Sequence, residues 1–341
     1  MLISLQSTIN IFCPERKITM PKIKYGPEHP DETYKPHRYE EHLFDTGEVL
    51  INFATSGSSD KPAVVLIPGQ TESWWGYEKA MGLLSEHFQT FAVDLRGQGR
   101  SSRTPGRYTY DNFGNDLVKF IAFHIKRPVI ISGLSSGGVI AAWLSAYAPA
   151  GMIRAAHYED PPLFSSETKP AIGPGIREGA GPVFELYNTY LGGQWCIGDW
   201  EGMLEGVGDF LPAHMMISFQ AGYSKFKNEP PQNMKEYDPE WAKAFTTGSV
   251  SASCDHERML KKVKCPVLFT HHLSKIDPET GRHLGASTTR QVDHVEAIIK
   301  KTGQPFTRLS FPEMGHNMHL LDPELYARTF TEWAKTLPGE E

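Results

Sequence analysis

Apolar residues in the first half of the chain gather in short unbroken runs, each followed by a longer stretch with helical spacing. The short runs are rich in β-branched residues and apolar on both faces, which is typical of central strands in a parallel sheet. They cover residues 63–67, 90–93, 129–132 and 153–158, and the helical stretches cover residues 74–88, 108–126 and 136–147. This alternation, at about thirty residues per unit, predicts a parallel sheet with right-handed crossovers and helices on both faces.

The alternation stops in the middle of the chain. Residues 163–262 are rich in Gly, Pro and aromatic residues, with short helical patches near residues 181–190, 210–223 and 239–245. Strands are again expected at residues 266–270 and 306–311, with helices at 289–301 and 323–336. We therefore expect an α/β core over residues 37–162 and 263–341, a helical lid over residues 163–262 above the site, and an N-terminal arm over residues 1–36.

The length, net charge and cysteines of the chain limit its domain organisation, its binding partners and its compartment. The chain has 341 residues, 40% of them hydrophobic, which suffices for one large domain with an insertion. Its net charge of −6 argues against nucleic acid or an anionic membrane as the main partner. The scattered cysteines, Cys13, Cys196, Cys254 and Cys265, read as free thiols of a reducing compartment. We expect a cytoplasmic protein, leave a homodimer open, see no signal peptide in residues 1–10, and note Met20 as a second candidate start.

One stretch carries the chemistry, namely Gly133-Leu134-Ser135-Ser136-Gly137 between a predicted strand and a predicted helix. A serine at the tip of such a sharp turn needs glycine two residues away on either side, because the two backbones pass too close for a Cβ. Ser136 fails this test, since Leu134 stands two residues before it. We therefore predict Ser135 as a nucleophile; the alternative is an ordinary Gly/Ser turn.

Four motifs in order extend this prediction: Ile67-Pro68-Gly69-Gln70, residues 94–101 (Asp-Leu-Arg-Gly-Gln-Gly-Arg-Ser), residues 133–137, and Gly315-His316. With them the chain resembles the α/β-hydrolase superfamily over about residues 38–337. The resemblance implies an eight-stranded, mostly parallel sheet with a lid inserted after the sixth strand. It also implies a structural role for residues 94–101, and we expect Asp94 and Arg96 to brace loops beside the nucleophile turn.

The base and the orienting acid come next. The resemblance places the base after the last strand, where His316 is the first candidate and His319 the alternative. For the acid we expect Glu159, with Asp277 as the runner-up, because fungal zearalenone-type lactone hydrolases and some haloalkane dehalogenases carry a Glu at this offset from the nucleophile. The elbow and the Tyr158-Glu159-(x)-Pro161 turn also resemble those of the lactone hydrolases. Asp160 is expected to cap the turn at Pro161.

Backbone N–H groups of Gln70 and Ser136 are the expected oxyanion donors, since both should lie where negative charge develops. Trp74 and Trp75, just beyond the oxyanion turn, and Leu134 are the expected substrate-binding residues. His271, His272, His283 and Asp277 are residue types that could form a metal site. We expect none, because adjacent histidines on a strand point to opposite sides.

These observations together predict a serine hydrolase that cleaves an ester or lactone bond of an apolar small molecule through an acyl-enzyme, without a cofactor. The same triad could instead cleave a C–C, amide or thioester bond, or act as a perhydrolase. From a different class, the chain could be a non-catalytic small-molecule receptor on the same fold.

Overall fold

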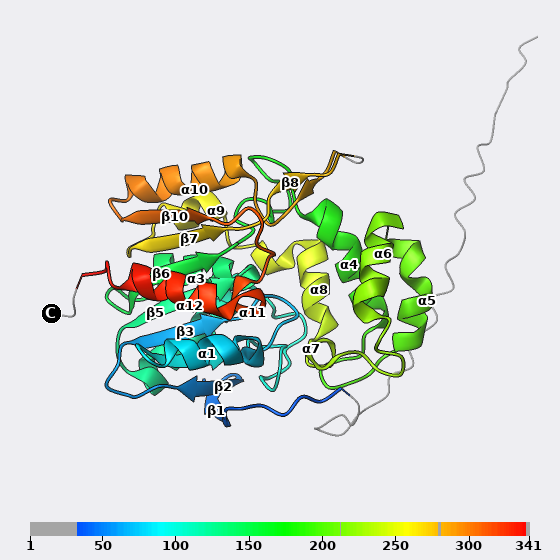
Figure 1. Ribbon diagram of the computed structural model, residues 1–341, viewed down its shortest axis with the longest axis horizontal. Coiled ribbons are helices and arrows are strands. Elements are labelled where there is room, and N and C mark those ends of the chain that lie inside the picture. The colour runs from blue at the N-terminus through cyan, green and yellow to red at the C-terminus, as the bar shows by residue number, and fades with distance from the viewer. Residues whose placement is uncertain (1–32, 212, 279–280, 339–341) are drawn as a thin grey trace, which may run out of the picture.

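Eight strands form one sheet at the centre of the computed structural model, which describes residues 33–211, 213–278 and 281–338 (Figure 1). The strands are β1 (Glu41–Asp45), β2 (Leu50–Ser56), β3 (Ala63–Ile67), β4 (Gln89–Val93), β5 (Val129–Leu134), β6 (Ile153–Glu159), β7 (Val267–His271) and β10 (Phe306–Ser310). Their order is β1-β2-β4-β3-β5-β6-β7-β10. Strand β2 pairs antiparallel with β1 and β4, and all other pairs are parallel. The expected fold class is therefore confirmed.

Helices cover both faces of the sheet (Figure 1). One face packs against η1 (Trp74–Tyr77), α1 (Glu78–Leu84), α11 (Met318–Leu321) and α12 (Pro323–Ala334). The other packs against α2 (Tyr110–Phe120), α3 (Ser136–Tyr147), α9 (His256–Leu260) and α10 (Thr289–Lys301). Alternate residues of β3 serve the two faces: Val64 packs on the first and Val65 on the second. Full burial of such a side chain contributes about 1.5–3 kcal/mol, which explains why strands between two helical layers are apolar throughout.

The long segment between β6 and β7 is helical, as expected. It contains α4 (Arg177–Tyr190), α5 (Trp200–Phe210), α6 (Ala213–Tyr223), α7 (Gln232–Lys235), α8 (Pro239–Thr247) and η3 (Ser249–Ser251) ahead of α9. Helices α4 to α8 lie together beside the sheet on the right of Figure 1. We call this segment between β6 and β7 the insertion. The division of the chain into core, lid and arm stays a prediction.

Local chemistry explains where the elements differ from expectation. The expected helix at residues 108–126 changes at Phe120 into the π-helical turn η2 (Ile121–Ile125) and stops at Lys126, whose φ is +59°. The patch expected near residues 210–223 corresponds to α6, whereas α5 before it was not expected. Asp199 caps α5 by accepting a hydrogen bond from the Gly202 N–H. The short hairpin of β8 (Lys275–Ile276) and β9 (His283–Leu284) was not predicted, since two-residue strands carry no periodicity.

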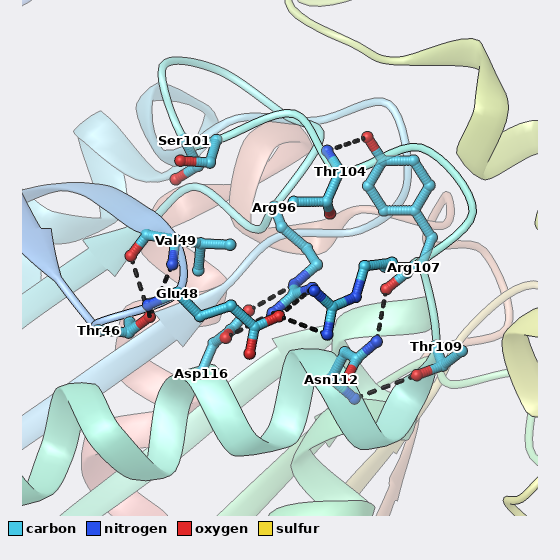
Figure 2. A network of polar contacts seen from close by, with 12 residues as sticks. Thr46, Glu48, Val49, Arg96, Ser101, Thr104, Arg107, Thr109, Asn112 and Asp116 are labelled. Atoms are coloured by element: carbon cyan, nitrogen blue, oxygen red, sulfur yellow. Dashed lines mark hydrogen bonds and ion pairs between the residues drawn. The ribbon is translucent and has the colours of Figure 1, made fainter.

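Asp94 joins two loops, as expected, whereas Arg96 joins a helix to a turn. Asp94 accepts hydrogen bonds from the backbone N–H groups of Trp74 (2.8 Å) and Arg100 (3.1 Å), and so joins the loops after β3 and β4. Arg96 donates twice to Asp116 of α2, at 2.7 Å each, and also contacts Glu48 of the β1–β2 turn (Figure 2). A buried guanidinium needs such a two-pronged carboxylate partner. Arg96 therefore ties α2 to the edge of the sheet.

Several predictions fall at the limits of the described chain. Residues 1–32, with most of the expected arm, Cys13 and Met20, lie outside it. Its first residue, Thr33, donates its backbone N–H to Glu229 of the insertion at 3.2 Å. Cys196, Cys254 and Cys265 are free and buried. In the described residues, none of the helices has both the length and the apolar character needed to cross a bilayer.

Candidate active site

Ser135 lies at a strained turn between β5 and α3. Its backbone angles are φ +53° and ψ −118°, outside the regions that L-residues favour, at a cost of about 1–3 kcal/mol. Both glycines are sterically required: a Cβ on Gly133 would lie 2.1 Å from the Gly137 carbonyl oxygen, and a Cβ on Gly137 would lie 2.4 Å from that of Ile67. The turn leaves Ser135 half-buried in a cavity of about 780 Å³.

His316, in the loop after β10, lines the same cavity as Ser135 and Asp160. Its Nδ1–H donates to Oδ2 of Asp160 at 2.7 Å, and the His316 side chain is 46% exposed while that of Asp160 is 2% exposed. Asp160 directly follows β6 and has φ +41°, and its second oxygen accepts the backbone N–H of His272 at 3.1 Å. This leaves Nε2 of His316 as the ring nitrogen that can serve as a base.

The expected pairing of Glu159 with His316 is wrong. Glu159 instead accepts from the backbone N–H of His319 at 3.0 Å and from its Nδ1 at 3.1 Å. His319 is fully buried and stacks on Tyr77 with ring centroids 3.9 Å apart. Side chains of successive strand residues point to opposite faces, so Glu159 faces the layer of α11 and α12 while Asp160 turns towards the cavity.

The other two acid assignments change accordingly. Asp160 binds the His316 imidazole rather than capping the turn at Pro161. The runner-up Asp277 lies in the β8–β9 turn, where its backbone N–H donates to the Arg282 carbonyl at 2.8 Å. Strand register is the signal that identifies Asp160. Leu134 of β5 pairs with Glu159 of β6, so the next residues along, Ser135 and Asp160, are level with each other.

The two histidine–carboxylate pairs have shifted pKa values. Burial lowers the pKa of His316, but the hydrogen bond and charge of Asp160 raise it more, so that it lies above 6.5. Burial likewise lowers the pKa of His319, and the charge and hydrogen bond of Glu159 reverse this shift and raise it. Burial raises the pKa of Glu159, but the charge and hydrogen bond of His319 lower it to about 2. Glu159 and His319 therefore form a buried ion pair.

Gln70 and Ser136 both line the cavity beside Ser135, as expected. Ser136 is the first residue of α3, so its backbone N–H has no partner within the helix. The loop that carries Gln70 packs against the nucleophile turn, because a Cβ on Gly69 would lie 3.4 Å from that of Ser135. Buried Gln98 holds this loop by donating to the Gly69 carbonyl at 2.8 Å.

The expected substrate-binding residues do not line the cavity in the described part of the chain. Trp74 is fully buried and donates to Glu41 at 2.7 Å, and Trp75 donates to Glu236 at 2.8 Å. Leu134 is 1% exposed. The apolar lining comes instead from the core, the insertion and the β8–β9 hairpin, and includes Tyr110, Ile176, Phe184, Met215, Phe245 and Leu284.

His271 and His272 point apart, as expected for strand neighbours. The His271 ring donates to the Ser287 carbonyl at 2.8 Å, whereas the His272 ring contacts the carbonyls of Gly315 and His316. Across residues 33–211, 213–278 and 281–338, no group of three or more His, Cys, Asp or Glu side chains is arranged to hold a metal ion.

Solved structures with a similar fold include hydrolases. An enol-lactonase from Burkholderia xenovorans LB400 superposes with a TM-score of 0.61 at 16% identity, covering 86% of this chain and 100% of that one. A hydrolase from Pseudomonas aeruginosa PA01 gives a TM-score of 0.60 at 18% identity, covering 86% of this chain and 98% of that one. At such identities the likeness concerns the fold alone.

Sequence relatives match over a shorter stretch. The 3-oxoadipate enol-lactonase 2 of Acinetobacter baylyi is 30% identical over 105 residues, which are 30% of this chain and 38% of that protein. The 2-(acetamidomethylene)succinate hydrolase of Mesorhizobium japonicum is 30% identical over 93 residues, 27% of this chain and 33% of that protein. The matched stretch thus spans about a third of either relative.

A family model described as "Alpha/beta hydrolase family" matches residues 64–329, most of the chain. This range includes the nucleophile turn, both histidine–carboxylate pairs and the whole insertion. The chain therefore belongs to the alpha/beta hydrolase family.

Proposed function

We propose that this hydrolase is a serine hydrolase that cleaves an ester or lactone bond of an apolar small molecule. The observation that carries the proposal is the 2.7 Å bond from His316 Nδ1 to Asp160, in a cavity that also exposes Ser135 on its strained turn. A serine, a histidine and a buried carboxylate in this order are the parts that acyl transfer requires. Asp160 takes the acid role first assigned to Glu159.

Each group has one task in the reaction. Ser135 Oγ attacks the carbonyl carbon while Nε2 of His316 takes its proton, and Asp160 stabilises the resulting imidazolium. The backbone N–H groups of Ser136 and Gln70 receive the oxyanion. His316 then returns the proton to the leaving alkoxide, and a water molecule, deprotonated by the same nitrogen, releases the acid from Ser135.

The cavity supports an apolar substrate of moderate size. Its volume of about 780 Å³ lies within the range of about 300–1,000 Å³ that small-molecule sites occupy. Aromatic and aliphatic side chains dominate its wall, among them Phe184 and Phe245 from the insertion and Leu284 of the hairpin. The insertion would then act as the lid. The enol-lactonases among the relatives favour a lactone or a comparable ester.

A covalent probe and a set of p-nitrophenyl esters and small lactones test the proposal. We expect the wild-type chain to hydrolyse members of the set repeatedly and to gain one fluorophosphonate adduct, located on Ser135 by peptide mass spectrometry. Ser135→Ala should lose both properties. Ser145→Ala is the matched control, since that hydroxyl donates to the Ala141 carbonyl within α3. Turnover that survives Ser135→Ala contradicts the proposal, and a wild type without turnover or adduct favours a receptor.

A further inference from the structure

A line of buried polar side chains crosses the face of the sheet that packs on α12. It comprises Tyr326, Ser132, His157, Thr270 and His272, all at most 1% exposed. The successive distances are 2.7 Å (Tyr326 to Ser132), 2.8 Å (Ser132 to His157 Nδ1), 3.0 Å (His157 Nε2 to Thr270) and 3.2 Å (Thr270 to His272 Nε2). The line ends where His272 Nδ1 meets the backbone carbonyls of Gly315 (3.0 Å) and His316 (2.9 Å).

The carbonyls at the end of the line determine which atom donates in every bond. A carbonyl only accepts, so His272 carries its proton on Nδ1, and its Nε2, in the neutral ring, must accept from the Thr270 hydroxyl. That hydroxyl has one proton, so it accepts from His157 Nε2–H. Nδ1 of His157 then accepts from Ser132, and Ser132 accepts from Tyr326.

Burial supports a neutral ring at the centre of this line. Desolvation lowers the pKa of His157 to about 4, although the charge of Glu159 opposes the shift. A neutral imidazole offers one donor and one acceptor, which is what its two neighbours require. The opposite direction would need His272 to carry a proton on both nitrogens.

His272 also contacts the catalytic pair on both sides. Its backbone N–H donates to Oδ1 of Asp160 at 3.1 Å, while its ring holds the loop that carries His316. The two oxygens of Asp160 are thus occupied by His272 and His316. His272 does not line the cavity, so it can affect the reaction only through these two residues.

We propose that His272 is a positioning residue, which holds the Asp160–His316 pair in register through a one-way line of hydrogen bonds that begins at Tyr326. The inference rests on the proposed function, since it gives His272 its task in the same site. It predicts two fixed tautomers: Nδ1–H in His272 and Nε2–H in His157.

The tautomers can be read without any substrate. In ¹⁵N-histidine-labelled full-length protein near pH 7.5, we expect the His272 ring to be protonated on Nδ1 alone and the His157 ring on Nε2 alone. The variants His272→Asn and His157→Gln assign the signals by their disappearance. A doubly protonated His272, or a proton on its Nε2 alone, overturns the proposal whether or not the protein hydrolyses esters.

Kinetics test the link to the reaction. His272→Phe removes the ring donor and should lower kcat by about 10²-fold, the cost of a small misplacement of a catalytic group, with KM unchanged. It should also lower the pKa that governs kcat/KM, because His316 loses its alignment with Asp160. His272→Asn keeps an N–H near the position of Nδ1 and should restore most of both properties.

Two further comparisons separate this task from general support of the fold. His271→Asn alters the neighbouring buried histidine, whose ring hydrogen-bonds the Ser287 carbonyl, and should keep the wild-type pH profile. Thr270→Val breaks the line: the His157 ring loses the acceptor of its Nε2–H and should no longer be held in one tautomer, while His272 keeps its proton on Nδ1. Thr270→Ser should keep both tautomers. A folded His272→Phe variant with wild-type kcat and pH profile refutes the positioning role. Absence of turnover in every variant and in the wild type would instead refute the proposed function and leave the tautomer result standing.

Discussion

Two histidine–carboxylate pairs lie side by side at the end of β6. They are alike in composition but differ in exposure and in the groups that they contact. Asp160 and His316 open into the cavity, and the imidazole keeps one nitrogen free for a substrate. Glu159 and His319 have no exposed surface, and their ring is stacked on Tyr77. The last residue of β6 and the residue after it thus supply a buried ion pair on one side and a pair open to the cavity on the other.

The difference teaches that partner and exposure, rather than residue type, decide what such a pair does. A buried ion pair offsets its desolvation cost only with good hydrogen bonds, and Glu159 has three from His319. A base must reach its substrate, so the catalytic pair gives up part of its burial. Variants at the four positions should therefore separate into losses of activity and losses of stability.

The largest expected effect is that of His316→Ala. We expect kcat for a p-nitrophenyl ester to fall by about 10⁶-fold, because a triad without its base leaves the serine unactivated. The unfolding midpoint should change little, since the His316 side chain is half exposed. If His319→Ala gave the larger loss of kcat in a folded protein, the two pairs would have to exchange roles.

The next effect distinguishes the two acids. Asp160→Asn should lower kcat by about 10⁴-fold, because the amide cannot hold the Nδ1–H tautomer or stabilise the imidazolium. Glu159→Gln is the matched control, one residue away with the same charge removed, and should retain activity while it remains folded. A large loss of kcat in folded Glu159→Gln with none in Asp160→Asn would restore the original assignment.

Glu159→Gln should instead lower stability, by about 3 kcal/mol, because it removes the nearer of the two carboxylates beside the buried His319 imidazole and leaves only Glu72, at 3.6 Å. The deficit should depend on pH. The lowered pKa of Glu159 contributes stability that is lost as pH falls from 4.5 to about 2, and the raised pKa of His319 contributes stability that is lost as pH rises above 6.5. Urea unfolding of both proteins should therefore show the largest difference between about pH 4.5 and 6.5, and a deficit independent of pH would argue against an ion pair.

The smallest effect is a displacement of the pH profile. His316 must be neutral to act as a base, so kcat/KM should rise with pH through a pKa above 6.5 and then level off. The residual activity of Asp160→Asn should show a lower midpoint, because the main group that raises the His316 pKa has been removed. Glu159→Gln should move the midpoint less, since Glu159 is the more distant influence.

Local steric rules made the sharp turn of Ser135, the proposed nucleophile, predictable from the sequence. Close backbone contacts require glycine at positions 133 and 137. Such a requirement produces a spacing of glycines that can be recognised in the sequence. The sequence does not reveal the carboxylate partner of His316, because Glu159 and Asp160 are adjacent and only the register of β5 against β6 tells which of them is level with Ser135. Sequence offset alone carries no information about the face to which a side chain points.

The residues that line the cavity could not be predicted from the sequence, for a different reason. Trp74 and Trp75 follow the oxyanion turn in sequence, but each gives its indole N–H to a buried or half-buried carboxylate, Glu41 or Glu236. Glu236 follows α7 of the insertion, so the partner of Trp75 lies more than 150 positions away in the chain. Contacts between residues so far apart in the sequence cannot be recognised from a local pattern of residues. A hairpin as short as β8–β9 cannot be recognised from one either.

The proposed triad and the cavity wall come from different parts of the chain. Ser135, Asp160 and His316 follow β5, β6 and β10, whose positions are held by the backbone ladder of the sheet. Much of the surface that a substrate would touch belongs to the insertion and the hairpin, which stand outside that ladder. Substitutions at Phe184 or Leu284 can therefore retune which molecules are accepted without disturbing the reacting atoms, so that a new substrate preference need not begin with a new catalyst.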